Sequence, residues 1–412
     1  MIPFLLLSIL IFNVMFSYGF IGFKKNPFLI FNVWWLIWIT LSYLNITNFY
    51  VVSDATYIWV TLSVLVVNII AVFFKDYKLK PFSGITTSYL KFSGVVEVVY
   101  LFSLIFFAIK MYFLMAGGEN YWKVRFYFYG LELDGEVVNF FSTPLVAHLF
   151  YLLKAFSVVN FIVGMSLFNS GKGRFLFFLP IFNIILFCLI AAGRDVIFYM
   201  VIIFIFSLKS GRFLYYSKYY SLIGVFVLYM TTLRGGLDTA FYALISYFTG
   251  PIIYMDLLIR DVGQFYNGTV VLSLLFSPLI YFSNLITGAE VPNSYTVVGQ
   301  ELMESVQISD FSPFYDYFNA LPTWYYFFYR DFGYAGFLIY PIILSIVVML
   351  FYSKLSIFKN EHLALMSYIE ACLLWSIFRP EVLGFYNILI ILAVVFYFKG
   401  DRDAARNFSN RL

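Results

Sequence analysis

Long apolar runs follow one another along almost the whole chain, and they constrain its fold more than any other feature. Most are about as long as the roughly 20 residues that a helix needs to cross a bilayer, and short stretches with charge, Gly or Pro separate them. The 412 residues are 62% apolar and 12% charged, whereas a soluble domain is roughly 45–50% apolar and about 25% charged. The sequence therefore predicts an all-α polytopic integral membrane protein, with residues 1–412 in a single transmembrane domain.

The approximate bounds of the predicted helices are 2–22, 28–49, 56–74, 94–116, 140–168, 175–192, 196–208, 220–233, 239–259, 269–287, 333–352, 363–378 and 382–398. The first run has neither a basic start nor a small-residue cleavage site, which is typical of a retained span rather than a removed signal peptide. The runs at 239–259 and 269–287 either both cross the bilayer or are both re-entrant or interfacial. The predicted number of transmembrane helices is therefore about 11–13.

Lys and Arg gather in the short loops on one side of the predicted bundle. These residues are Lys24, Lys25, Lys75, Lys78, Lys80, Lys172, Arg174, Lys209, Arg212, Lys218, Lys354, Lys359, Lys399, Arg402, Arg406 and Arg411. Because positive loops stay in the cytoplasm, the N-terminus should lie outside and the C-terminus inside.

Two segments on the outer side, 117–137 and 288–332, are too long for simple turns, and long loops usually carry function. In the second one, Tyr295, Val298, Leu302 and Val306 recur at helical spacing after a Pro-Asn-Ser start signal, which predicts a short amphipathic helix.

Several classes of chemistry are disfavoured by what the sequence lacks. It contains no Walker loop, dinucleotide fingerprint, paired-His zinc motif or GxSxG elbow. With only two histidines, we expect no metal site, and we expect no cofactor. The net charge of +4 reflects short basic loops rather than one binding face, so nucleic acid is not an expected partner. A catalyst built from this chain must use arginine, carboxylate and aromatic side chains.

Some arginines break the charge pattern because they lie in outer loops or at the outer ends of spans. They are Arg125, Arg194, Arg234, Arg330 and Arg379. A guanidinium binds phosphate oxygens in a bidentate fork, so several of them converging would suit a lipid pyrophosphate. The alternative is that each arginine pairs with a nearby carboxylate, as Arg194 with Asp195, Arg330 with Asp331, and Arg379 with Glu381.

Aromatic residues crowd the same two outer segments. They are Tyr121, Trp122, Tyr127 and Tyr129 in the first and Tyr315, Tyr317, Trp324, Tyr325 and Tyr326 in the second. Such residues form either an ordinary interface belt or flat surfaces on which sugars stack. Ionisable residues within the spans are either buried and functional or paired across helices. These are Glu97, Lys110, His148, Lys154, Asp256 and Glu370, of which Asp256 and Glu370 are interpreted as structural.

Short motifs in the second half of the chain resemble those of the Wzy-type oligosaccharide repeat-unit polymerases. The most specific pair is Asn293-Ser294-Tyr295-Thr296 with Tyr329-Arg330-Asp331-Phe332-Gly333-Tyr334-Ala335-Gly336. Others are Ala192-Gly193-Arg194, Leu233-Arg234-Gly235-Gly236 and Tyr247-Phe248-Thr249-Gly250-Pro251. The resemblance covers roughly residues 190–350 and the general hydropathy of the rest.

This resemblance implies a metal-independent glycosyltransferase of the bacterial inner membrane. It would join undecaprenyl-pyrophosphate-linked oligosaccharides into O-antigen or capsular polysaccharide at the periplasmic face, where the 117–137 and 288–332 loops would lie. A chain-length regulator protein would be a further partner. Candidate catalytic residues are Arg194, Arg234, Arg330, Asp331 and Glu301, with Asp331 or Glu301 as the base. Candidate substrate-binding residues are Arg125, Asn293, Tyr295, Trp324, Tyr325 and Arg379.

Three other functions remain open at this point. A transporter or flippase of lipid-linked sugars would place its key charges at mid-span around a cavity. An O-antigen ligase would have a similar site and a different acceptor, and a scaffold would make the outer arginines replaceable. Gly333 and Gly336 also have a purely structural alternative, namely a tight loop and close helix packing.

Overall fold

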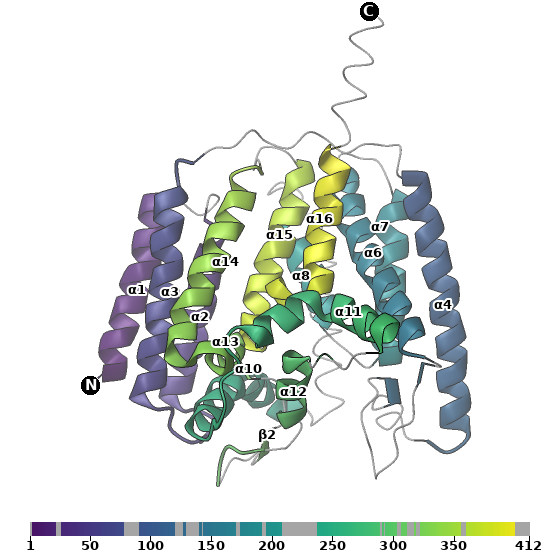
Figure 1. The fold of residues 1–412 in the computed structure, drawn as a ribbon. Coiled ribbons are helices and arrows are strands. Elements are labelled where there is room, and N and C mark those ends of the chain that lie inside the picture. Colours follow the sequence, from purple (N-terminus) through teal and green to yellow (C-terminus); the bar gives the residue numbers. More distant parts are fainter. Residues whose placement is uncertain are drawn as a thin grey trace, which may run out of the picture. The chain divides into compact units, whose positions relative to one another are not determined.

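The computed structural model describes residues 2–21, 26–77, 90–119, 127–128, 140–141, 143–169, 174–191, 195–207, 237–288, 291, 293–302, 306–310, 317–318, 322–355 and 360–399. These residues belong to two compact units (Figure 1). Unit 1 takes in residues from 1–80, 214–355 and 372–385, and unit 2 takes in residues from 81–213, 356–371 and 386–412. The expected domain over 1–412 is therefore described as two units, each of which is treated by itself.

Unit 1 is a bundle of long helices joined to a group of shorter ones. Its elements are α1 (Ile2–Ile21), α2 (Phe28–Leu44), α3 (Asp54–Phe74), α10 (Leu237–Arg260), α11 (Thr269–Thr287), α12 (Ser294–Glu301), β1 (Val306–Gln307), β2 (Tyr317–Phe318), α13 (Trp324–Phe332), η3 (Gly333–Ala335), α14 (Gly336–Tyr352), η4 (Trp375–Ile377) and η5 (Glu381–Leu383). Helix α3 packs against α1, α2 and α14, while α11 packs against α12 and α13. The two short strands are antiparallel, with Val306 opposite Phe318.

Unit 2 is built from α4 (Leu90–Ala116), α6 (Pro144–Asn169), α7 (Arg174–Ala191), α8 (Asp195–Ser207), most of α15 (Asn360–Leu374) and α16 (Phe385–Lys399). Helices α4, α6 and α7 pack against one another. The core at one end of these helices is aromatic: Phe128 and Phe150 lie 4.9–6.0 Å from neighbouring Phe rings such as Phe107, Phe140 and Phe187.

The helix surfaces fit a lipid environment. Five described helical segments are long and apolar enough to cross a membrane, namely 54–74, 90–116, 145–168, 269–287 and 324–352. In α4, the exposed residues include Phe92, Phe102, Phe106 and Phe113, each at least 60% exposed. A soluble protein would not leave such a continuous apolar face in water. The chain is thus an all-α membrane protein, as the apolar runs predicted.

The predicted helix positions agree closely with the described ones. The predicted helix at 220–233 lies outside the described residues, and the run at 333–352 is divided into η3 and α14. The predicted short helix in the second long loop is α12, in which Val298 is buried. Val306, expected on the same helical face, instead lies in strand β1. Figure 1 shows α11 at a large angle to α14, whereas α3 runs beside α14 and α1 runs beside α3.

Two glycines allow very close backbone contacts, one in each unit. A Cβ added at Gly164 of α6 would overlap the carbonyl oxygen of Leu176 in α7. Pro180 lies four residues after Leu176 and has no N–H, so this carbonyl loses its normal helical donor and turns toward α6. In unit 1, a Cβ at Gly336 would overlap the carbonyl oxygen of Phe328. Helices therefore approach each other at small residues, as is common in membranes.

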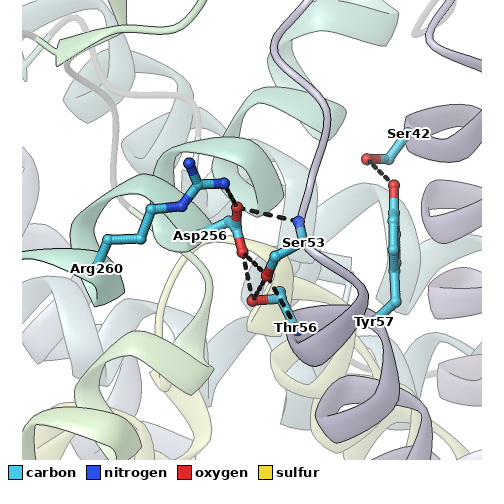
Figure 2. Close-up of polar contacts among 6 residues, drawn as sticks. All are labelled: Ser42, Ser53, Thr56, Tyr57, Asp256 and Arg260. Carbon is cyan, nitrogen blue, oxygen red and sulfur yellow. Dashed lines mark hydrogen bonds and ion pairs between the residues drawn. The ribbon is translucent and has the colours of Figure 1, made fainter.

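A buried aspartate joins α10 to the beginning of α3 (Figure 2). One oxygen of Asp256 accepts hydrogen bonds from the hydroxyls of Ser53 and Thr56, both at 2.5 Å, and the other accepts from the Ser53 backbone N–H at 3.1 Å. Arg260, one turn later in α10, pairs with the same carboxylate at 2.5 Å. These contacts give Asp256 a structural role, which agrees with the sequence interpretation.

Candidate functional site

The Arg330 cluster consists of Arg330, Glu301, Tyr326 and Tyr266 in unit 1. The guanidinium of Arg330 is 5% exposed and binds both carboxylate oxygens of Glu301, with one N–O distance of 3.3 Å. It also donates to the Tyr326 hydroxyl at 2.9 Å and lies 5.1 Å from the centre of the Tyr266 ring. Glu301 has a side chain that is 45% exposed. The cluster is therefore a buried cation held by a carboxylate that solvent can reach.

The cluster owes its geometry to the way short helices begin and end. Asn293 caps α12, because its side chain accepts from the Thr296 N–H at 3.2 Å, as Asn commonly does at this position. Helix α13 ends at Gly333, whose φ of +60° is a conformation that glycine adopts readily. The backbone N–H of Tyr266 donates to the Arg330 carbonyl at 2.8 Å, which brings the loop before α11 against the end of α13.

Asp331 points away from Arg330 and caps α11. Its carboxylate accepts from the backbone N–H groups of Val270 at 2.9 Å and Val271 at 3.1 Å, and from the Tyr340 hydroxyl at 2.6 Å. It is fully buried. A helix N-terminus favours a negative charge, so this site stabilises the carboxylate without a cation. The predicted alternative pairing of Arg330 with Asp331 is wrong, because Glu301 is the partner of Arg330.

Tyr295 and Arg379 lie near this cluster, in α12 and just before η5. The Tyr295 ring stacks on Phe327 of α13, with ring centres 5.2 Å apart. Burial raises the pKa of Tyr295, and the positive charge of Arg379 opposes this shift only in part, so the hydroxyl stays protonated. Arg379 forms an ion pair with Glu381, which is the neighbouring partner that the sequence suggested as an alternative to phosphate.

Two predicted substrate-binding residues have packing roles here. Trp324 and Tyr325 are both completely buried. Trp324 contacts Phe31 with ring centres 5.4 Å apart, and Tyr325 lies parallel to Phe337 at 5.0 Å. Since neighbouring rings cover both residues, their aromatic faces are not open to a sugar in this structure.

Other predicted site residues lie outside the described residues. They are Arg125, Arg194, Arg234, Tyr121, Trp122, Tyr129 and Tyr315. The structure brings Arg330 to Glu301 and packs α12, which Asn293 caps and which contains Tyr295, against α13. Arg379 is linked to this group by its electrostatic effect on Tyr295. In the described residues, no group of three or more His, Cys, Asp and Glu side chains is placed to hold a metal ion.

The sequence interpretation missed Tyr266 and Tyr340 as members of this region. Tyr266 lies far from the motifs that drew attention, in the loop before α11, and Tyr340 lies four residues after Gly336, inside an apolar run. Tyr326 had a detectable signal, because it precedes Arg330 by four residues and therefore lies on the same helical face.

Comparisons of the chain with models of protein families, with curated proteins and with solved structures found no match.

Proposed function

We propose that the chain is a membrane glycosyltransferase that joins undecaprenyl-pyrophosphate-linked oligosaccharide repeat units into O-antigen or capsular polysaccharide. One observation carries this proposal: the two segments most similar to Wzy-type polymerases, 293–296 and 329–336, lie in one site. The Tyr295–Phe327 stack and the Arg330–Glu301 ion pair join α12 and α13, the helices on which Tyr295 and Arg330 of these segments lie. If both segments take part in one function, they must lie close together in the fold.

The chemistry of the proposed reaction needs positive charge near the leaving group more than it needs proton transfer. The lipid pyrophosphate leaves as a stable anion, and positioned cations stabilise the charge that develops on it. Arg194 and Arg234 remain the first candidates for this role, and Arg330 is the third, with Arg125 and Arg379 for a second phosphate. Arg330 is held in one orientation by Glu301 and Tyr326, so little reorganisation is needed when phosphate arrives.

The acceptor hydroxyl loses a proton when the new glycosidic bond forms. Of the two candidate bases, Asp331 already accepts three hydrogen bonds and is fully buried. Glu301 also accepts hydrogen bonds, from Arg330, but it is partly exposed and therefore has the better access to a substrate hydroxyl. We assign Glu301 as the base and Asp331 as a positioning residue that fixes α11 against α13. The acceptor oxygen bonds to the anomeric carbon, the bond to pyrophosphate breaks, and Glu301 takes the proton.

The proposed topology follows from the charge pattern. It places the N-terminus and the 117–137 and 288–332 loops in the periplasm, and the C-terminus in the cytoplasm, with about 11–13 transmembrane helices in the inner membrane. The large angle between α11 and α14 supports the interfacial alternative for the 239–259 and 269–287 pair, and thus the lower number. The periplasmic position of 288–332 can be tested with cysteines introduced in this loop. An impermeant thiol reagent should label them from the periplasm.

A transporter of lipid-linked oligosaccharide is the second candidate. Glu97 favours it, because this carboxylate is buried inside α4, a helix long and apolar enough to cross a membrane, and ionisable residues buried in spans often mark the ion or substrate pathways of transporters. Cells that lack the chain distinguish the two: a glycan capped by a single repeat unit indicates a polymerase, and loss of surface glycan indicates a transporter. Transfer of preformed polymer to a different lipid would indicate a ligase.

The direct test uses purified full-length protein in lipid nanodiscs with undecaprenyl-pyrophosphate-linked repeat units. We expect Arg330→Ala to lower the polymerisation rate by about 100-fold or more, the usual effect of removing one such donor. Arg330→Lys should restore only part of it, because lysine lacks the bidentate fork. Arg260→Ala is the matched control, since it removes an exposed arginine of the same unit. Normal chain lengths in Arg330→Ala would overturn the assignment.

A further inference from the structure

Unit 2 contains a carboxylate that is completely buried among neutral side chains. Glu97 of α4 accepts hydrogen bonds from Ser157 at 3.0 Å and Asn160 at 2.8 Å, both on α6, and from Asn183 of α7 at 2.7 Å. All four residues are 2% exposed or less. We call them the Glu97 cluster. It lies about two turns after the start of α4, beyond the first turn, where unpaired N–H groups and the helix dipole would stabilise a charge.

The cluster lacks a positive charge to balance the carboxylate. Its three donors are two side-chain amides and a hydroxyl, all neutral, and no described cationic side chain forms an ion pair with Glu97 or acts on it electrostatically. An ionised group inside a membrane protein normally pairs with an opposite charge. Three neutral hydrogen bonds lower the cost of the buried charge but leave the net charge in place.

A second feature of the cluster indicates a missing electropositive partner. The Nδ2 of Asn183 donates to the Glu97 side chain and, at 3.0 Å, to the Glu97 carbonyl. The Oδ1 of the same amide is buried and accepts no hydrogen bond from the part of the chain that the structure describes. Buried amide oxygens are nearly always paired. A carboxylate without a cation and an amide oxygen without a donor thus belong to the same small group of side chains.

We propose that the Glu97 cluster binds a single small positive charge from solution, supplied as Na⁺ or as a proton. The oxygen atoms of Glu97, Ser157 and Asn183 are hard ligands of the kind that such cations prefer. A divalent ion would leave a net positive charge and normally uses more carboxylates than one. This proposal does not depend on the polymerase activity, and it assigns unit 2 a cation site of its own.

Among the described residues, no other titratable side chain contacts Glu97 from the helices packed against it. From α6 it meets Ser157 and Asn160, and from α7 it meets Asn183. Other titratable residues of α4, α6, α7 and α16 include Tyr100, Lys154, Cys188 and Tyr397. Lys154 lies over the Phe187 ring, and the Tyr397 hydroxyl forms a hydrogen bond with Ser93. A response to pH or Na⁺ that Glu97→Gln abolishes can therefore be attributed to Glu97.

The test measures the thermal unfolding midpoint of the purified full-length protein in detergent. One series replaces choline chloride by NaCl at constant ionic strength, and a second varies pH without Na⁺. Binding to the folded state raises the midpoint, and we expect a shift of about 2–4 °C in one of the two series. Glu97→Gln keeps the shape and removes the charge, so it should fold and lose the shift. Asp261→Asn, at an exposed carboxylate, should retain it.

The two series identify the cation. A shift with Na⁺ that Glu97→Gln abolishes identifies Na⁺, and a shift with acid alone that Glu97→Gln abolishes identifies the proton. Ser157→Ala provides a second variant, which should fold and need a several-fold higher cation concentration for half of the effect. A wild-type protein that responds to neither series, or a response that survives in Glu97→Gln, would overturn the proposal.

Discussion

The two units bury carboxylates in opposite ways. In the described part of unit 1, Asp256 and Asp331 are buried at the N-terminal ends of α3 and α11, and each accepts at least one hydrogen bond from a backbone N–H. In the described part of unit 2, Glu97 is buried inside α4, about two turns after its start, and its carboxylate receives only side-chain hydrogen bonds. Hydrophobic patterning makes all three look alike, since each is an acid within or beside an apolar run.

The difference shows how a membrane protein can hold a negative charge. A helix N-terminus supplies partial positive charge and unpaired N–H groups together, so Asp256 and Asp331 are stable as structural anions. The interior of a helix supplies neither, because its N–H groups are already used. Glu97 therefore needs charge compensation from elsewhere, and the two kinds of site should respond differently to the same substitutions.

The largest expected effects come from the glycines that hold each region together. Gly164→Ala forces a methyl group into the Leu176 carbonyl, and Gly336→Ala does so at Phe328. We expect each to lower the free energy of unfolding by about 3 kcal/mol, because backbone cannot move aside as a side chain can. Gly164→Ala should also reduce the cation response of Glu97, since it separates α6 from α7. Unfolding in detergent measures the first effect and the NaCl and pH series measure the second.

Gly299→Ala in α12 is the control, because no atom lies within 4 Å of the position that its Cβ would take. Alanine favours a helix over glycine by about 0.5–1 kcal/mol, so this variant should be unchanged or slightly more stable. A similar loss of stability at Gly299 and Gly164 would show that close helix contact is not the cause.

Exchanging carboxylate for amide tests the comparison of the units directly. In Asp331→Asn, an NH₂ group must face a backbone N–H of Val270 or Val271. We expect a loss of about 2 kcal/mol, because a buried hydrogen bond is replaced by two opposed donors. Glu97→Gln should change stability by less than about 1 kcal/mol, since it removes an uncompensated charge and since the side-chain amide of Asn160 or Asn183 can turn its oxygen toward the new NH₂ group, which a backbone N–H cannot do. Equal losses in the two variants, measured by unfolding, would contradict this difference.

The apolar runs predicted nearly all of the described helices, because bilayer thickness sets their length. Start signals were also informative, and Asn293 begins α12 as its sequence suggested. The partners of charged residues were not predictable in the same way. Arg330 contacts Glu301 rather than its neighbour Asp331, since consecutive residues of a helix point in different directions. The roles of Gly333 and Gly336 agree with their structural alternative, a positive φ and a close backbone contact.

The aromatic residues were harder to interpret from sequence. Trp324 and Tyr325 follow directly on a polar loop and look like exposed interface residues, but both are buried in unit 1. Composition alone cannot distinguish a ring that packs in a core from one that lies at an interface, because both environments favour Tyr and Trp. The packing of α13 against α2 and α14 decides which environment these two rings occupy.

A double-mutant cycle measures the interaction within the Arg330 cluster. Arg330→Met, Glu301→Gln and the double variant should give a coupling of about 1 kcal/mol, because Glu301 is partly exposed and solvent screens the pair. The expected value is smaller than the effect of Asp331→Asn. A coupling near zero would mean that Tyr326 and Tyr266 alone orient Arg330. Polymerisation assays on the same variants separate this positioning role from the contact with phosphate.

The smallest effect is expected where a buried anion has an exposed cation. The Arg260 side chain is 53% exposed, while its partner Asp256 keeps hydrogen bonds to Ser53 and Thr56. Arg260→Ala should therefore cost about 0.5 kcal/mol, as is common for exposed ion pairs, and 1 M NaCl should remove even this difference. If unfolding measurements instead showed a loss as large as that of Asp331→Asn, the end of α3 would not be enough to stabilise Asp256. The contrast between the helix ends in unit 1 and the helix interior in unit 2 would then fail, because Asp256 and Glu97 would both depend on a cation.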